Sequence, residues 1–376
     1  MRSSRERLHQ SLNHREPDRI PLDLGGIVSG ITRLSHRSLL KYLGFQEEDE
    51  ILVDRVQQLV KPDSRILEVL GIDTRYAYLP IPASVWKADR EGGLWVDAWG
   101  VQRRFTGLYF DMLGHPLEHV VETSDLPGLT WPDARKPEHY EELAAQVEAL
   151  QESGYGIIVN LIGSCFEFAW YLRGFEKFLS DLVLNPGLAC SILDIMLDFQ
   201  TAQFAELLNR VGDQIDVVLV GDDLATQNGP FISPDIYRRL IKPRQKKLFD
   251  TIRGKTRAKL FYHSCGAVSP FIPDLIDIGV DILNPVQVAA RGMDAAYLKR
   301  EFGSYLCFWG GIDTQSVLPF GTPDDVRDEV RRRIDQLAPG GGYVLGAVHN
   351  IQADVPPENV VAMFEEALRY GGYGVG

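Results

Sequence analysis

The sequence predicts an α/β fold, a TIM (β/α)8 barrel with an N-terminal α/β extension and an antiparallel insertion. From about residue 154 onward, apolar strand-like runs alternate with helical patterns, which is typical of a parallel sheet with crossover helices. Polar and ionisable residues follow the predicted strands, as they do at the catalytic end of such barrels. The length of 376 residues suits a barrel with one insertion. We therefore expect a single domain over residues 1–376.

The first 140 residues are predicted to be less regular than the rest. A helix is expected at 4–12 and a first strand at 19–24, followed by helices at about 35–43 and 65–70. Between residues 75 and 110 the pattern becomes strand-like and aromatic-rich, with no helical period. We interpret residues 75–135 as an antiparallel insertion that covers one end of the barrel.

The remainder of the chain is predicted to alternate between strands and helices. Strands are expected at residues 156–162, 216–221, 259–263, 280–285, 305–309 and 342–348, with helices at 188–211, 234–253, 270–278 and 323–337. The last helix has clear start signals, because Thr322 can cap it, Pro323 occupies its first position, and two aspartates follow at the positive end of the helix dipole.

Composition narrows the class of protein. The chain has 39 basic and 52 acidic residues, a net charge of −13, so a nucleic-acid partner is not expected. No stretch approaches the roughly 18 apolar residues of a membrane span, and the N-terminus has no apolar signal core. We expect a cytoplasmic protein that does not contact a membrane. Four scattered cysteines do not make a disulfide framework, so the thiols should be reduced.

Metal-ligand residue types stand at the ends of two predicted strands. The strand at 259–263 closes on His263, with Cys265 two residues later, and the strand at 342–348 is followed by His349. A catalytic zinc usually has three protein ligands and one open position, whereas a structural zinc has four. The pattern therefore indicates a zinc site with an open position. The alternative is two hydrogen-bonded histidines and a small buried apolar cysteine.

The other strand ends provide candidates for catalysis and substrate binding, because strand ends converge at one mouth of a closed barrel. Asp222 and Asp223 are adjacent carboxylates whose pKa values should separate if they are buried, and Glu167 is a third candidate for a fourth metal ligand or for proton transfer. The alternative for the aspartate pair is that one of them caps the next turn. The residues expected to bind substrate are Asn160, Asn284, Gln287, Asp313 and Asn350.

Several motifs along the chain are similar to those of one protein family. They are the opening at 5–21 (Arg-Glu-Arg-Leu-His through Arg-Ile-Pro), Ile-Gly-Ser-Cys-Phe-Glu-Phe at 162–168, Ile-Ser-Pro-Asp-Ile-Tyr at 232–237, His-Ser-Cys-Gly at 263–266, Gly-Gly-Ile-Asp-Thr-Gln at 310–315 with Leu-Pro-Phe-Gly-Thr-Pro at 318–323, and Pro-Pro-Glu-Asn at 356–359. With these motifs the chain resembles the uroporphyrinogen decarboxylase superfamily, and within it the branch of zinc-dependent, corrinoid-linked methyltransferases.

The resemblance implies a TIM-type barrel and a zinc site of the form H-x-C with a distant third ligand. Decarboxylases of the superfamily share an Arg-Gln-Ala-Gly-Arg segment that grips propionate groups, but residues 24–33 here read Leu-Gly-Gly-Ile-Val-Ser-Gly-Ile-Thr-Arg. Porphyrinogen decarboxylation is therefore not expected. His349 stands where the methyltransferase branch usually has its last cysteine. Imidazole in place of thiolate raises the charge of the site by one, which makes zinc a better Lewis acid and suits an ether oxygen.

We therefore expect a zinc-dependent methyltransferase that moves a methyl group between a small methylated substrate or a thiol and cobalamin. The chain has no D-x-H-x-x-G segment, so the cobalamin is expected on a separate corrinoid protein. One alternative is a metal-independent decarboxylase of a carboxylated small molecule, bound through Arg33, Arg75 or Arg104. Another is a barrel that only binds a small molecule, and metal analysis would separate the first hypothesis from both.

Overall fold

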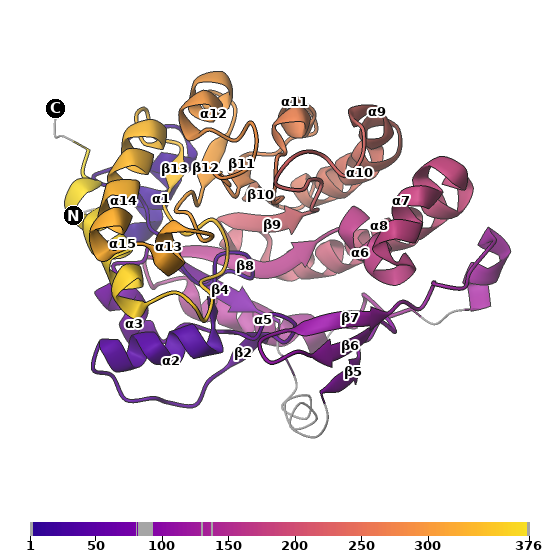
Figure 1. The fold of residues 1–376 in the computed structure, drawn as a ribbon, viewed down its shortest axis with the longest axis horizontal. Helices are drawn as coiled ribbons and strands as arrows, with labels where there is room; N and C mark the ends of the chain where they lie inside the picture. Colours follow the sequence, from indigo (N-terminus) through magenta and orange to yellow (C-terminus); the bar gives the residue numbers. More distant parts are fainter. Residues whose placement is uncertain (1–2, 80, 82–92, 129–130, 137, 374–376) are drawn as a thin grey trace.

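A parallel sheet of seven strands forms the centre of the molecule (Figure 1). The structure is a computed structural model that describes residues 3–79, 81, 93–128, 131–136 and 138–373. The strands follow the sheet order β4, β8, β9, β10, β11, β12 and β13. Their bounds are Thr74–Tyr78 (β4), Gly156–Gly163 (β8), Val217–Gly221 (β9), Lys259–His263 (β10), Ile282–Asn284 (β11), Cys307–Trp309 (β12) and Tyr343–Val344 (β13).

The segment Pro21 to Asp23 closes this sheet into a barrel. On one side the N–H of Asp23 donates to the carbonyl of Leu345 at 2.9 Å, and the N–H of Leu345 donates to the carbonyl of Pro21 at 2.9 Å. On the other side the N–H of Asp73, just before β4, donates to the carbonyl of Leu22 at 2.9 Å. The segment therefore fills the eighth strand position between β13 and β4, and the predicted TIM-barrel class is confirmed.

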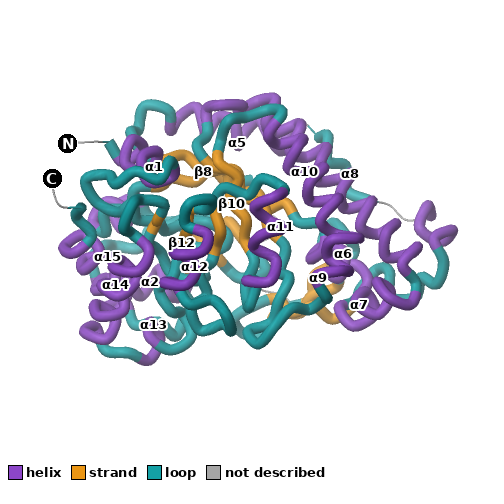
Figure 2. Tube along the Cα trace, turned by 90° about the horizontal axis from the view of Figure 1, so that it is seen from above, coloured by secondary structure: helices purple, strands orange, loops and turns teal. Residues whose placement is uncertain are grey.

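Helices surround the strands, as Figure 2 shows from above. They are α1 (Ser4–Leu12), α2 (Arg33–Tyr42), α3 (Ser64–Val69), α5 (Glu138–Leu150), α6 (Phe166–Arg173), α7 (Phe175–Leu184), α8 (Pro186–Val211), α9 (Pro234–Ile236), α10 (Lys242–Arg253), α11 (Ile272–Asp277), α12 (Ala295–Phe302), α13 (Val317–Phe320), α14 (Pro323–Leu337) and α15 (Pro357–Tyr370). Short 3-10 turns occupy Thr123–Gly128, Gly212–Gln214 and Ser269–Phe271.

Two helix predictions had different outcomes. The helix expected at 234–253 is not a single α-helix, because a π-helical turn at Tyr237–Ile241 separates α9 from α10. The start of α14 is confirmed: the hydroxyl of Thr322 accepts from the N–H of Asp325, whose carboxylate accepts from the N–H of Thr322 at 2.8 Å. This reciprocal pair is a capping box, which stabilises the first turn.

Helix α1 closes the barrel at the amino ends of its strands. Leu8 and Leu12 belong to the apolar cluster inside the barrel. Beside them, the guanidinium of Arg7 lies 2.6 Å from the carboxylate of Asp73, and Arg19 lies 2.7 Å from the same fully buried group. Because this end is plugged, the carboxyl ends of the strands remain as the place for a site.

The antiparallel part of the chain is smaller than predicted. Residues Thr74–Tyr78 pair in parallel with β8, so the prediction that the insertion begins at residue 75 is wrong. Aromatic residues fit a barrel strand as well as an antiparallel one, and this ambiguity misplaced the boundary. The antiparallel sheet consists of β5 (Leu94–Val96), β6 (Gln102–Phe105) and β7 (Phe110–Gly114), and residues 82–92 of the predicted insertion lie outside the described residues.

A second antiparallel sheet precedes it in the chain, formed by β1 (Ile31–Thr32), β3 (Leu59–Val60) and β2 (Leu52–Asp54). Both small sheets contribute side chains to a cavity at the carboxyl ends of the barrel strands, described below. Across the described residues, no helix combines the length and the apolar character needed to cross a lipid bilayer.

Candidate functional site

The three predicted metal ligands lie together at the carboxyl ends of the strands. One ligand atom from each of His263, Cys265 and His349 lies within 4.8 Å of the other two. Sγ of Cys265 is 3.5 Å from Nε2 of His263. Tetrahedral zinc with bonds of roughly 2.0 Å to nitrogen and 2.3 Å to sulfur would place these atoms about 3.5 Å apart. The donor set fits zinc, and the distance between Cys265 and His263 matches this spacing.

A hydrogen bond fixes which nitrogen of His263 can bind a metal. Nδ1 of His263 lies 2.6 Å from Oδ1 of Asn284, and the amide nitrogen of Asn284 donates to the carbonyl of Trp309 at 3.2 Å. With its oxygen accepting, Asn284 requires the proton on Nδ1, which leaves the lone pair of Nε2 on the side of Cys265. Burial lowers the pKa of His263 and of His349 to about 4, so both imidazoles are neutral and able to coordinate.

The turn that carries Cys265 requires the glycine that follows it. Gly266 has a φ of +90°, and a Cβ there would lie 2.4 Å from the carbonyl oxygen of Ala225 and 2.6 Å from that of Thr226. The backbone N–H of Cys265 donates to Asp223 at 2.8 Å. Burial raises the pKa of the Cys265 thiol well above its usual value, and the neighbouring carboxylates add to this effect. A thiolate in this position needs a cation beside it, which a bound metal would supply.

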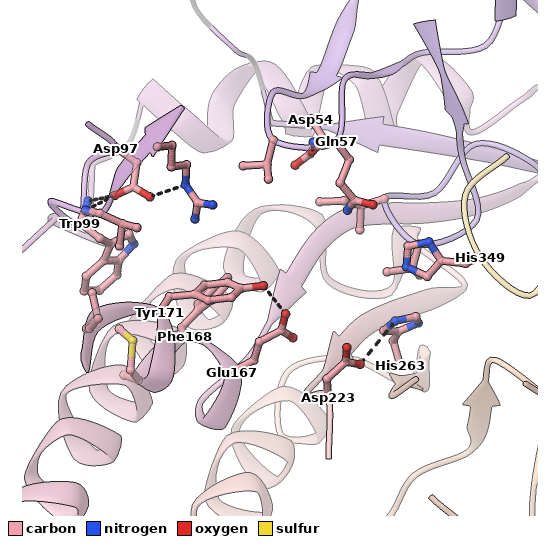
Figure 3. Close-up of a pocket in the computed structure, with 17 residues that line it drawn as sticks. Asp54, Gln57, Asp97, Trp99, Glu167, Phe168, Tyr171, Asp223, His263 and His349 are labelled. Carbon is pink, nitrogen blue, oxygen red and sulfur yellow. Dashed lines mark hydrogen bonds and ion pairs between the residues drawn. The ribbon is translucent and has the colours of Figure 1, made fainter. Parts of the chain in front are cut away.

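A cavity of about 300 Å³ lies against the two histidines (Figure 3). Its walls combine strand ends of the barrel, helix α6 and the two antiparallel sheets. The lining residues are Ile27, Val28, Asp54, Val56, Gln57, Asp97, Trp99, Val101, Arg103, Glu167, Phe168, Tyr171, Leu172, Met196, Asp223, His263 and His349. The cavity is thus mostly apolar and aromatic, with a few polar groups, as small-molecule sites usually are.

Two of the predicted carboxylates line this cavity beside the metal ligands. Burial, and then the charge of Asp223, raise the pKa of Glu167 to about 8, while the hydroxyl of Tyr171 donates a hydrogen bond to Glu167. Burial also raises the pKa of Asp223, whose Oδ1 is 3.9 Å from Nε2 of His263. Glu167 therefore holds a proton at neutral pH and lines the cavity.

Comparison with known proteins identifies the family. The model of the uroporphyrinogen decarboxylase (URO-D) family matches residues 115–370. The chain belongs to the URO-D family. The membership indicated by the sequence motifs is thereby confirmed.

The relatives of this URO-D protein are named for two different activities. A methylated-thiol–coenzyme M methyltransferase of Methanosarcina mazei is 24% identical over 267 residues, which cover 66% of this chain and 67% of that protein. A uroporphyrinogen decarboxylase of Psychromonas ingrahamii is 25% identical over 285 residues, covering 70% and 75%. The solved structure of a methyltransferase from Methanosarcina mazei has a TM-score of 0.65 at 18% identity, over 98% of this chain and 99% of that one, and so shares its fold.

The carboxylate of Asp222 in this URO-D protein is hydrogen-bonded to neighbouring groups of the chain. Its carboxylate accepts from the backbone N–H groups of Phe166 at 2.8 Å and Glu167 at 2.9 Å, from the amide of Gln245 at 2.9 Å and from the hydroxyl of Ser164. It caps the start of α6 and does not line the cavity. These donors occupy its oxygens, which agrees with the alternative that one aspartate of the pair caps the next turn, and a part for Asp222 in the chemistry stays a prediction.

The five residues predicted to bind substrate do not line this cavity either, and their role in substrate binding stays a prediction. Each of them accepts a hydrogen bond from a neighbouring group that it holds in place. The acceptors and their partners are Asn160 with the N–H of Ile27 (2.6 Å), Asn350 with the N–H of Gly30 (2.6 Å), Gln287 with the N–H of Gly266 (2.6 Å), Asp313 with the N–H of Gln315 (2.8 Å) and Asn284 with His263.

The arginines considered for carboxylate binding are also absent from the lining. Arg75 stacks on Tyr155 at 3.6 Å, Arg33 pairs with Glu50 at 3.0 Å, and Arg104 is exposed on β6. Arg103, which sequence reasoning missed, lines the cavity instead and is 7% exposed. The sequence gives no signal that separates the adjacent Arg103 and Arg104, which lie on opposite faces of β6 with Arg103 buried and Arg104 exposed.

We predict that Gly266→Ala destabilises the protein and weakens metal binding, because the added Cβ must displace two backbone carbonyls. The matched control is Gly340→Ala, since Gly340 has a φ of +77° but open space around its Cβ position. Urea unfolding should show that Gly266→Ala costs about 1–3 kcal/mol more than the control. Equal stability and equal zinc content of the two variants would contradict the prediction.

Proposed function

We propose that this member of the URO-D family is a zinc-dependent methyltransferase. It transfers a methyl group between a small methylated substrate or a thiol and cobalamin carried by a separate corrinoid protein. The observation that supports the proposal most is the meeting of His263, Cys265 and His349 at the wall of a mostly apolar cavity. A methyltransferase among the relatives agrees with it. The four cysteines are free thiols, which suits the cytoplasmic location that we infer.

His263, Cys265 and His349 would hold the zinc, with Asp223 or the substrate in the fourth position. Bound there, zinc would supply Lewis acidity to the oxygen or sulfur that carries the methyl group. The protein's own contribution begins with Asn284, which fixes the tautomer of His263. Apolar residues of the cavity exclude water from this end, which strengthens the local electrostatic interactions.

The overall reaction needs one proton. The bond between the methyl carbon and its oxygen or sulfur breaks, and the carbon bonds to the cobalt(I) of the partner's corrinoid, which becomes cobalt(III). The electron pair of the broken bond stays on the oxygen or sulfur, which takes up the proton. We assign the donation of this proton to Glu167, which is oriented by Tyr171 and held protonated at neutral pH by burial.

The alternative of a metal-independent decarboxylase has less support from the cavity. In the described part of the chain, Arg103 is the one arginine that lines it, and its Nε already donates to Asp97 at 3.2 Å. Four carboxyl groups line the same space. A substrate with several carboxylates would meet charge of its own sign rather than the arginine cluster that it requires.

The purified protein should contain about one zinc per chain, because three ligands of suitable type and spacing are in place. His349→Ala should lose most of the zinc, as measured by plasma mass spectrometry. His119→Ala is the matched control, since His119 is exposed and lies outside the ligand group. Full zinc content in His349→Ala would disprove the ligand assignment.

The transfer itself can be followed by absorbance. Zinc-loaded protein mixed with a cobalt(I) corrinoid protein and a methylated substrate should form methylcobalamin, and the zinc-free protein should not. The same preparation should not convert uroporphyrinogen to coproporphyrinogen, because residues 24–33 lack the arginine pair that grips propionates. Equal methyl transfer without zinc, or measurable porphyrinogen decarboxylation, would favour the lyase hypothesis.

The role of Glu167 predicts a pH profile. A proton donor acts while it is protonated, so the rate should be high below a pKa of about 8 and should fall as the pH rises through it. Glu167→Gln should lower the rate roughly 10²- to 10⁴-fold and remove this dependence. Glu176→Gln, at an exposed position of α7, is the control. An unchanged profile in Glu167→Gln would exclude Glu167 as the donor.

A further inference from the structure

The cavity has an excess of acidic groups. The carboxyl groups of Asp54, Asp97, Glu167 and Asp223 line it, and among the described residues Arg103 is the one lysine or arginine that does so. Away from the metal ligands, the carboxyl groups of Asp54 and Asp97 face the single guanidinium of Arg103. This part of the cavity therefore has one more carboxyl group than it has cations before a substrate enters.

The excess charge lies at the wall built by the antiparallel sheets. Asp97 accepts from the N–H groups of Trp99 and Val101, each at 3.0 Å, and from Nε of Arg103 at 3.2 Å. Asp97 and Arg103 thus neutralise each other. Asp54 accepts from the N–H of Gln57 at 2.5 Å, and no lysine, arginine or histidine in the described ranges forms an ion pair with Asp54.

Burial raises the pKa of Asp54, and Arg103 acts in the opposite direction. One guanidinium therefore serves two carboxylates at this wall. A cationic group of a ligand would restore the balance and would keep Asp54 ionised. A carboxylate of a ligand would instead be the third negative charge around Arg103, and juxtaposed like charges are costly in a desolvated site.

Aromatic rings border the same space. Trp99, Phe168 and Tyr171 line the cavity, and Arg103 already lies 5.6 Å from the ring centre of Tyr171. Rings of this kind attract cations through their negative faces. Figure 3 shows Asp97 and Trp99 across the cavity from His263 and His349, so the two ends of a bound molecule meet different surroundings.

We propose that the cavity selects substrates with a positive charge at the end remote from the transferred methyl group, namely small amines in their ammonium form, and rejects acids. The inference rests on the proposed function, because it places the methyl-bearing oxygen or sulfur at the metal end. Asp54 receives the ammonium group, the aromatic rings border the same space, and the ether or thioether atom points to the histidines. Asp54 is the residue that determines this specificity.

Three probes of matched shape test the selection: 4-methoxybenzylamine, 4-methoxybenzyl alcohol and 4-methoxybenzoate. Calorimetric titration into the zinc-loaded protein should show the amine binding about tenfold more tightly than the alcohol, with the benzoate weakest, as charge complementarity requires. Equal affinities, or tightest binding by the benzoate, would overturn the proposal. This comparison uses the unaltered protein and does not depend on the folding of a variant.

A substitution tests the residue. Asp54→Asn should weaken binding of the amine about tenfold and leave that of the alcohol within about twofold. Asp111→Asn, at an exposed position of β7, should change neither affinity. An Asp54→Asn variant that folds and keeps the full preference for the amine would show that Asp54 does not set it.

Methyl transfer from the same probes separates this inference from the proposed function. If the amine binds preferentially but no probe yields methylcobalamin with any corrinoid protein, the proposed function fails while the charge selection stands. If the benzoate donates its methyl group as readily as the amine does, the charge selection is wrong while the methyltransferase function stands.

Discussion

The shape of the site depends on one requirement: buried backbone N–H groups at the barrel mouth must find acceptors. An unpaired buried donor costs roughly 1–3 kcal/mol, so each loop at the mouth needs a polar side chain. Asp222 meets this requirement for the first turn of α6, Asn160 and Asn350 for the loop from Ile27 to Gly30, and Gln287 for Gly266. Asp222 thereby fixes the position of Glu167, and Gln287 fixes the turn that carries Cys265.

The same requirement explains how far the sequence could predict the molecule. The alternation of strands and helices predicted the barrel, and local capping signals predicted the start of α14. Residue types predicted the grouping of His263, Cys265 and His349, because thiol and imidazole groups are few and their chemistry is specific. An amide at a strand end carries no such signal. Whether Asn160 faces a loop backbone or a cavity depends on three-dimensional packing, which the sequence pattern does not encode locally.

The metal end of the cavity and its opposite wall come from different parts of the chain. Barrel strands supply the metal ligands and Asp223, whereas the small antiparallel sheets supply Asp54, Asp97 and Arg103. The end of the cavity that carries the metal ligands is therefore part of the packed barrel. The opposite wall stands on short strands that lie outside the barrel sheet. Substitutions in this wall can alter which molecule is accepted while the metal ligands and the core of the barrel stay as they are.

The closure of the barrel sets an order of events in folding. The segment around Leu22 bonds to Leu345, and helix α1 packs beneath strands from both halves of the chain. During synthesis the beginning of the chain leaves the ribosome long before its partners at the far end exist. The polar backbone edge of the first strand and the apolar face of α1 then stay uncovered until nearly the whole chain has emerged. Such long-range pairing slows folding and exposes the nascent chain to aggregation, so its yield in cells should depend on chaperones.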